Sequence, residues 1–429
     1  MYDIIIIGGG IAGLNIAKQF SDKFPTKKIL LLEKEKSLGG KIHTYEDKNM
    51  RVEEGASRFN ENHKNIFSII NELDLSDKIM KIENKPLFLK EKKIYDSKII
   101  DDIYLKIFKK TKKENIDDLQ KINLSKYLEN ILSKTEYEYF TEAFGYCSEL
   151  ILMNAYDALK LLKELNGQFY FLQGGLSQII KKLKNKILEN KNCRIITNSK
   201  VIDLNVFQKN GEKIFEIQKK SSYSEKIISY FSKICVFSIP KDAFEPIPFF
   251  KELTPLLSNI HSSSLCRIYS KYEEDENGKY WFSNMTKMVT DSRLKIVIPI
   301  GNEKKMQKND GVIMVSYTDG KHANYWEKIY EKNGIDGLNK SIKKEIKKTL
   351  GIEVPLPKFT NIFFWRNGVG YWGINADSEN ISKKIKKPND ELELYICGEN
   401  YSYEFQQWIE GALETSNDVF LKIIEKNYN

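Results

Sequence analysis

The sequence is poor in cysteine and proline and has no long apolar run, and each shortage excludes a class of protein. Five cysteines stand far apart in 429 residues, without a Cys-x-x-Cys pair, so neither a disulfide framework nor a zinc site is indicated. The ten prolines are too few for a Pro-rich linker. No stretch approaches the roughly 18 apolar residues of a membrane span, and the N-terminus lacks the features of a signal peptide. We therefore expect a cytoplasmic protein in a reducing compartment, without a membrane partner.

Charge of one sign is not concentrated anywhere along the chain, which argues against a nucleic-acid partner. The formal net charge is +9, from 68 basic and 59 acidic residues, and the two signs are interleaved. The densest basic run, 106–113, is typical of the solvated side of a helix. The four histidines form no close pair, so no metal site is predicted. A Gly-x-Ser-x-Gly nucleophile motif is also lacking.

The first 33 residues carry the pattern of a dinucleotide-binding βαβ unit. The apolar run 3–7 predicts a strand, and three glycines with G-x-G-x-x-G spacing follow before a predicted helix and a second strand that ends in Glu33. Gly8 permits a tight turn, Gly10 lets the backbone approach a pyrophosphate, and Gly13 allows close helix–strand packing. The helix N-terminus attracts phosphate, and Glu33 can accept hydrogen bonds from ribose hydroxyls.

Along the rest of the chain, helix-type and strand-type sequence patterns alternate several times. This alternation predicts interleaved domains rather than domains in series. Its length and its 41% hydrophobic residues suffice for two or three cores. Helices should dominate from about 86 to 170, short β-type runs occur over 193–240, a mixed region covers about 250–380, and a strand at 392–397 precedes a helix at about 408–425.

Two further segments favour FAD over NAD. The first, 38–44, is a second Gly-rich turn just after Glu33, from which backbone and a cation can reach the same pyrophosphate. The second is the C-terminal stretch formed by residues 395–400 and 408–416. Here Glu399 can bind a ribityl chain, and a helix that starts nearby would direct its positive end at the flavin ring.

Together these segments resemble the flavin-containing amine oxidases, the family of monoamine, polyamine and L-amino acid oxidases. The resemblance implies an α/β fold in which a Rossmann-like FAD-binding domain is interleaved with a mixed α+β substrate domain. It spans nearly the whole chain in the family's order. The glycines Gly8, Gly10 and Gly13, here called the nucleotide cradle, match together with Glu33. The other matching elements are Gly39-Gly40-Lys41, Glu54-Gly55-Ala56-Ser57-Arg58, Gln173-Gly174-Gly175-Leu176, Ser238-Ile239-Pro240, and Gly398-Glu399 with Trp408 to Ser416.

The resemblance also implies a division of the chain and a set of cofactor ligands. FAD-binding parts are expected at 1–85, 171–250 and 381–429, a helical substrate part at 86–170, and a substrate part with a mixed sheet at 251–380. Noncovalent FAD is expected, because 368–376, where covalent members have a cysteine, contains none. The expected FAD-binding residues are Gly8, Gly10, Ile11, Ala12, Gly13, Glu33, Lys34, Gly40, Lys41, Ala56, Ser57, Arg58, Val201, Gly398, Glu399, Trp408, Ile409 and Ala412.

For the substrate, the resemblance implies oxidation of the C–N bond of a small amine or amino acid by hydride transfer to flavin. The imine then hydrolyses to a carbonyl product and ammonia, and oxygen is reduced to hydrogen peroxide. Trp408 falls on an aromatic position of the family, and Tyr371 or Trp372 would form the opposite wall. Arg58 matches the arginine that grips the carboxylate in L-amino acid oxidases, a role that suits a planar guanidinium. In the alternative, Arg58 contacts the flavin or a structural carboxylate.

One departure from the family pattern leaves alternatives open. The family usually has a lysine near the flavin on the strand that matches 265–269, but no lysine occurs here before Lys271. Arg267 in this strand can orient a water but cannot act as a base. Lys41 replaces the usual arginine. The electron acceptor could therefore be a molecule other than oxygen. Two other functions also stay open: an FAD-dependent desaturase or porphyrinogen-type dehydrogenase acting on an apolar substrate, and a non-catalytic flavin-binding protein. A homodimer is compatible with the family.

Overall fold

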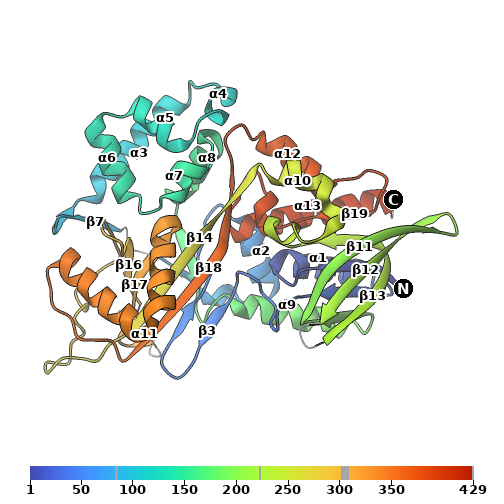
Figure 1. Cartoon of the computed structure of the whole chain (residues 1–429), viewed down its shortest axis with the longest axis horizontal. Coiled ribbons are helices and arrows are strands. Elements are labelled where there is room, and N and C mark those ends of the chain that lie inside the picture. Colours follow the sequence, from blue (N-terminus) through green and yellow to red (C-terminus); the bar gives the residue numbers. More distant parts are fainter. Residues whose placement is uncertain (83–85, 222–223, 301–308, 428–429) are drawn as a thin grey trace.

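Two seven-stranded sheets organise the chain, which a computed structural model describes over residues 1–82, 86–221, 224–300 and 309–427 (Figure 1). The first sheet runs in the order β10 (Cys193–Ile196), β2 (Ile29–Leu32), β1 (Tyr2–Ile7), β13 (Ser224–Phe237), β12 (Glu212–Ser221) and β11 (Ser199–Lys209), with β19 (Leu394–Ile396) beside β13. The second runs β18 (Phe359–Trp372), β14 (Ile260–Lys271), β17 (Val312–Asp319), β16 (Ile296–Pro299), β15 (Met288–Thr290), β7 (Leu87–Lys90) and β8 (Lys93–Tyr95).

The first sheet is parallel where its strands read as continuous Ile and Leu runs. Strands β10, β2, β1, β19 and the end of β13 pair in parallel, and both faces of this part are buried. The strand–turn–helix–strand prediction for the first 33 residues is confirmed as β1, α1 and β2. The helices that pack against one face are α1 (Ile11–Lys23), α9 (Ser177–Glu189) and α13 (Ile409–Asn427), next to α2 (Lys64–Glu72).

The opposite face of this sheet is covered by short elements, and its antiparallel part extends away from them. Figure 1 shows the long antiparallel strands β11, β12 and β13 at the right, at the same end as both chain termini. The covering elements are η3 (Pro248–Leu253), α10 (Thr254–Leu257) and α12 (Ser378–Lys386).

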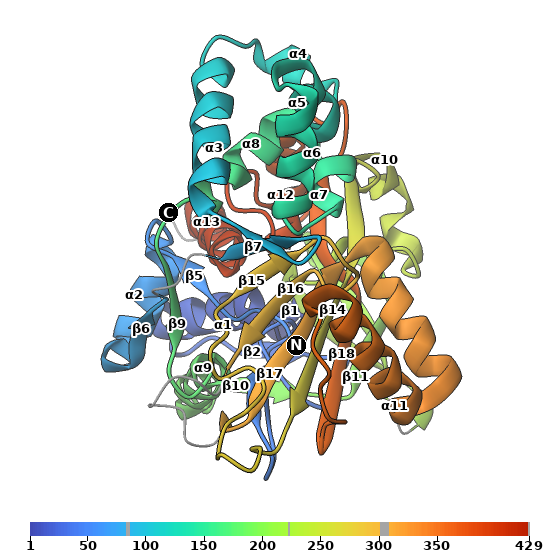
Figure 2. The same cartoon turned by 90° about the vertical axis from the view of Figure 1, so that its left-hand side faces the viewer.

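The second sheet has one face toward the first sheet and one face under a long helix. Along β14, Leu265 and Arg267 point to one side, while Cys266 and Ile268 belong to the core on the other side with Trp326. Trp326 is part of α11 (Gly320–Leu350), which covers that outer side (Figure 2). Residues 87–95 lie in the stretch expected to be mainly helical, yet they form β7 and β8, because β7 pairs with the distant β15.

A group of helices sits over one end of the second sheet. Its core is built from Ile107, Leu128, Phe140 and Leu162, and Tyr371 of β18 is packed into it. Across the described part of the chain, none of the helices combines the length and the apolar content needed to cross a membrane. The group comprises α3 (Ser97–Thr111), α4 (Ile116–Gln120), α5 (Leu124–Ile131), α6 (Lys134–Ala143), α7 (Ser148–Leu152) and α8 (Ala155–Leu165) (Figures 1 and 2).

Several smaller elements connect the two large sheets and the helical group. They are β3 (Thr44–Glu46) paired with β4 (Arg51–Glu53), the sheet of β5 (Phe59–Asn60), β9 (Phe169–Leu172) and β6 (Ile79–Lys81), and the 3-10 turns η1 (Ser76–Lys78), η2 (Lys241–Ala243) and η5 (Glu399–Tyr401).

Candidate active site

A cavity of about 910 Å³ is lined by both large sheets and by the helical group. Gly8 and Leu32 contribute from the ends of β1 and β2, Arg267 from β14, and Glu149 and Leu161 from α7 and α8. The ends of the parallel strands are where open α/β sheets bind their ligands. The volume is at the upper end of the roughly 300–1,000 Å³ of small-molecule sites, as expected for a dinucleotide with a small substrate.

The three glycines at the start of α1 serve three different geometric needs. Gly8 has φ +106°, and a Cβ there would lie 2.2 Å from the Ser238 carbonyl oxygen. A Cβ on Gly13 would lie 2.0 Å from the Gly8 carbonyl oxygen, so Gly13 is required for packing. A Cβ on Gly10 would meet nothing within 4 Å, and Gly10 lines the cavity. The backbone at Gly10 is therefore open to a ligand at a helix N-terminus, which fits a pyrophosphate.

Two backbone hydrogen bonds hold the Glu33 carboxylate in place. Its carboxylate accepts hydrogen bonds from the backbone N–H of Gly9 at 2.6 Å and of Glu35 at 2.8 Å, and the residue is buried while lining the cavity. A carboxylate has about four acceptor sites, so two remain. This arrangement fits an acceptor for the ribose hydroxyls of a dinucleotide.

Lys41 and Glu399 form an ion pair that joins the second Gly-rich turn to the C-terminal segment. The Lys41 ammonium lies 2.8 Å from Glu399 Oε2. Glu399 also accepts hydrogen bonds from the backbone N–H of Gly370 at 3.1 Å and of Gln407 at 3.2 Å. Both residues line the cavity. The carboxylate thus holds together three segments that are far apart in the sequence.

The structure brings nearly all the residues expected to hold FAD to one cavity. Every one of them lines it except Gly13, which packs behind the cradle. None of the five cysteines, all of which are described and free, is among the lining residues. The arrangement of cradle, acid and open glycine fits FAD.

Trp408 and Arg58 form a stacked group at the cavity. The Trp408 ring stacks on Phe169, with centroids 5.6 Å apart. The Arg58 guanidinium lies 4.4 Å from the Phe169 centroid and 5.8 Å from that of Trp408. Cation–π contacts of this kind fix the plane of a guanidinium. Both Arg58 and Trp408 line the cavity, and Trp408 Nε1 has no hydrogen-bond partner within the described residues.

Of the two aromatic residues on β18 that were expected at the substrate, Tyr371 lines the cavity and Trp372 does not. Tyr371 lines the cavity and is fully buried. Its neighbour Trp372 is not among the lining residues, because successive side chains of a strand point to opposite faces. Trp372 Nε1 donates to the Ser402 carbonyl oxygen at 3.0 Å inside the core. The expectation that Trp372 forms a wall is corrected accordingly.

Arg267 lines the cavity but is already held by neutral groups. Its Nη1 donates to the Glu53 carbonyl oxygen and its Nη2 to Ser57 Oγ, both at 3.2 Å. The guanidinium lies 4.5 Å from the Tyr317 ring centroid, and only 7% of the residue is exposed. Arg267 therefore contributes a fixed positive charge to the cavity wall.

Sequence reasoning missed several ionisable residues that line the cavity, among them Glu149 and Lys287. Glu149 is buried; burial and the nearby charge of Asp319 raise the pKa of its carboxyl well above the usual value. Burial, and then the charge of Arg58, lower the pKa of Lys287 to about 7. Neither residue belongs to a motif or a regular spacing, so no sequence signal would have identified them among 127 charged residues (68 basic plus 59 acidic).

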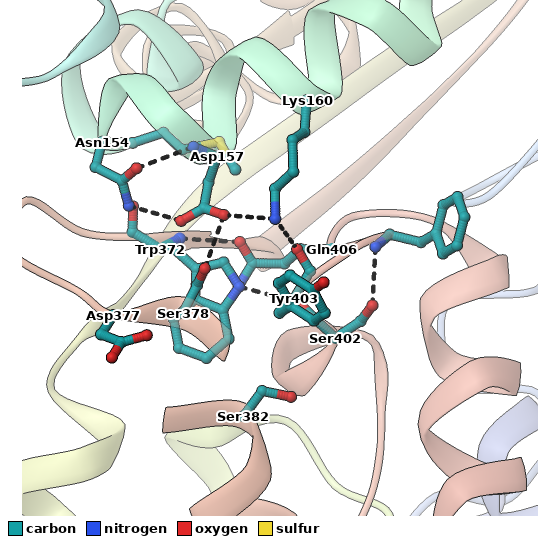
Figure 3. A network of polar contacts seen from close by, with 12 residues as sticks. Asn154, Asp157, Lys160, Trp372, Asp377, Ser378, Ser382, Ser402, Tyr403 and Gln406 are labelled. Atoms are coloured by element: carbon teal, nitrogen blue, oxygen red, sulfur yellow. Dashed lines mark hydrogen bonds and ion pairs between the residues drawn. The ribbon is translucent and has the colours of Figure 1, made fainter. Parts of the chain in front are cut away.

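A buried polar network ties the helical group to the loop that leads to Trp408 (Figure 3). Asp157 of α8 accepts hydrogen bonds from Asn154 Nδ2 at 2.8 Å and Ser378 Oγ at 2.9 Å, and pairs with Lys160 at 2.9 Å. Lys160 donates to the Tyr403 carbonyl oxygen at 2.6 Å. Burial raises the pKa of Asp157, as expected for a carboxylate withdrawn from water. The network fixes one side of the cavity without entering it.

Replacing Asp157 with alanine is expected to lower the free energy of unfolding by about 3 kcal/mol, because the Lys160 ammonium and two polar side chains lose their partner. Urea denaturation measures the change. Asp118→Ala is the matched control: its pair with Lys121 at 3.1 Å is exposed, with 72% and 62% of the side chains accessible, and exposed pairs contribute about 0–1 kcal/mol. Equal midpoints for the two variants would show that the network does not hold this junction.

Comparisons with known proteins agree with this geometry. A sequence model of NAD(P)-binding Rossmann-like domains matches residues 6–73, and one of flavin containing amine oxidoreductases matches residues 104–419. The chain is 20% identical to an uncharacterized protein of Acanthamoeba polyphaga mimivirus, over 98% of this chain and 93% of that one.

Solved structures with the same fold cover the chain from end to end. A putrescine oxidase variant superposes with a TM-score of 0.76 at 12% identity. A protein of Exiguobacterium sp. 255-15, provisionally assigned as a protoporphyrinogen oxidase, superposes with a TM-score of 0.74 at 15% identity. Each match covers 99% of both chains. At these identities the likeness is one of fold.

Proposed function

The chain belongs to the flavin-containing amine oxidoreductase family, and on that basis we propose that it oxidises the C–N bond of an amino acid, or of another amine that carries a carboxylate. The cofactor is FAD, which we propose is held noncovalently. When bound, the flavin accepts the hydride that leaves the carbon next to nitrogen, and the imine hydrolyses to a carbonyl product and ammonia. Oxygen is the proposed final acceptor, which gives hydrogen peroxide.

The observation that carries this proposal is the state of Arg58. Its guanidinium lines the cavity and is stacked on Phe169, and no carboxylate of the described ranges pairs with it. Arg58 is half-buried, and a partly desolvated guanidinium without a counter-ion is stabilised by an anionic ligand. A substrate carboxylate would accept two parallel N–H bonds from it, and the stacking already holds the guanidinium plane. Because the guanidinium is already held, substrate binding loses less side-chain entropy at Arg58.

The other lining residues set the protonation state and the dryness of the site. Arg58, Arg267 and Lys287 place cationic groups at the cavity, and like charges disfavour an ammonium there. Their field therefore favours the neutral amine, the form from which hydride can leave. Trp408 and Tyr371 supply apolar surface that excludes water and restricts the orientation of a small substrate.

The same charges weigh against an apolar polyene or porphyrinogen-type substrate. Such a substrate would leave Arg58 and Lys287 buried against hydrocarbon without any compensating negative charge. Diamines are disfavoured for a different reason, since their second ammonium would meet the same positive field. A non-catalytic flavin-binding protein remains the alternative that a direct assay excludes.

An aerobic assay with amino acids, simple amines and diamines tests the proposal. We expect oxygen consumption with the formation of hydrogen peroxide and ammonia in equal amounts, at a much higher rate for amino acids than for amines without a carboxylate. Turnover only of amines without a carboxylate would refute the assignment to Arg58. Reduction of the flavin by an amino acid under nitrogen, but without oxygen consumption in air, would replace oxygen by another acceptor.

A further inference from the structure

Lys287 belongs to the row of side chains that forms the cavity wall on the second sheet. Met288 pairs with Val297 in antiparallel register, so Lys287 lies beside Ile298. Ile298 in turn pairs with Met314. Lys287, Ile298 and Met314 all line the cavity. The lysine therefore faces inward, across a regular row of three strands.

Lys287 and Arg267 mark opposite sides of this wall. Arg267 on β14 pairs with Tyr317 on β17, and Tyr317 pairs with Ile296 on β16, which neighbours β15. Adjacent strands lie about 4.8 Å apart, so three steps separate the two backbones by about 14 Å. Burial, and then the charge of Arg58, lower the pKa of Lys287. Arg58 and Lys287 both line the cavity and lie close enough for their charges to interact.

The Lys287 ammonium has no protein counter-ion. Over the residues that the structure describes, no carboxylate lies within ion-pair distance of it and no acceptor takes a hydrogen bond from it. Glu149 lines the cavity too, but burial favours its neutral form, so it does not neutralise the two cations. Burial also favours the neutral form of Lys287, whose pKa is lowered to about 7, so a bound carboxylate would restore its charge. A ligand with two negative groups would pair with Arg58 and Lys287 together.

We propose that Lys287 binds a second carboxylate of the substrate, so that the substrate is an amino acid with an acidic side chain. This inference rests on the proposed function and narrows its substrate class. The fork of Arg58 takes the carboxylate next to the reacting carbon, where planar, bidentate geometry fixes the orientation. Lys287 is a point charge on a flexible stem and suits the distal carboxylate, whose position varies with the length of the side chain.

Isothermal titration calorimetry on the oxidised, FAD-bound protein tests this without turnover. The probes are the straight-chain dicarboxylates from malonate to adipate and the monocarboxylates of matching length. One dicarboxylate is expected to bind at least about 10-fold more tightly than its matched monocarboxylate. Lys287→Met should remove that advantage, because it weakens the binding of the dicarboxylate more than the binding of the matched monocarboxylate. Lys279→Met, at an exposed position, is the control and should change neither.

Each possible result supports or overturns the binding of a second carboxylate by Lys287. Equal affinity for mono- and dicarboxylates, no binding of either, or an equal loss of both in Lys287→Met overturns the inference. Unchanged FAD content and thermal midpoint show that Lys287→Met is folded. Binding is measured independently of catalysis. Lys287-dependent dicarboxylate binding without oxidation of any amine would refute the proposed function alone, whereas oxidation of neutral amino acids only would refute this inference alone.

Discussion

Replacing Arg58 with alanine is expected to lower kcat/KM for the amino acid substrate by about 100-fold or more, with FAD still bound. Truncating one partner of a desolvated charge pair costs about 2–5 kcal/mol, and each 1.4 kcal/mol is tenfold. The Arg58 guanidinium has aromatic faces on one side and the cavity on the other, so its loss removes the carboxylate contact. Steady-state kinetics, together with the FAD content from the visible spectrum, measure both parts of the result.

The decisive comparison uses a substrate pair that differs only by the carboxylate. Arg58→Ala should abolish the preference for the amino acid over the amine of the same skeleton, and leave the poor rate with that amine unchanged. Arg366→Ala is the matched control, since its side chain is 75% exposed and pairs with Glu327. An equal loss for both substrates would mean that Arg58 acts through the flavin or the fold.

Replacing Gly10 and Gly13 separately with alanine is expected to give opposite phenotypes. Gly10 has φ −73° and open space at its Cβ position, so Gly10→Ala should fold with nearly unchanged stability. Its methyl group would project into the space that the pyrophosphate requires, and the FAD affinity should fall by about 10-fold or more. In Gly13→Ala the new Cβ meets the Gly8 carbonyl oxygen, and overpacking of this kind costs about 1–3 kcal/mol.

Urea denaturation of the apoprotein and fluorescence titration with FAD separate the two effects. Gly13→Ala should shift the midpoint of unfolding to lower urea, and Gly10→Ala should not. The cradle assignment predicts that only Gly10→Ala combines wild-type apoprotein stability with weak FAD binding. Wild-type FAD affinity in Gly10→Ala would place the pyrophosphate elsewhere in the cavity.

The nucleotide cradle could be predicted from the sequence because its chemistry is local. The glycine spacing and Glu33 lie within one βαβ unit, and the structure shows the backbone contacts on which the prediction depended. Tyr371 and Trp372 could not be separated, since an uncertainty of one residue in a strand exchanges its two faces. Here the pairing of β18 with β14 sets that register.

The rest of the site depends on contacts between distant segments, which no local pattern encodes. Lys287 faces the cavity because β15 pairs with β7, some 200 residues earlier in the chain, and with β16. Glu149 is buried beside Asp319, 170 residues later, whose carboxylate accepts from the Cys147 and Ser148 backbone N–H groups. Single charged residues of this kind become informative only when the sheet register is known.

The most direct test of the account is the visible spectrum of the purified protein under nitrogen while amino acids and amines are added one at a time. We predict that an amino acid, and most efficiently one with an acidic side chain, bleaches the band of the oxidised flavin. Amines without a carboxylate should leave the band in place on the same timescale. A flavin spectrum that no amino acid or amine bleaches would contradict the proposed amine oxidation and favour a different substrate or a non-catalytic role.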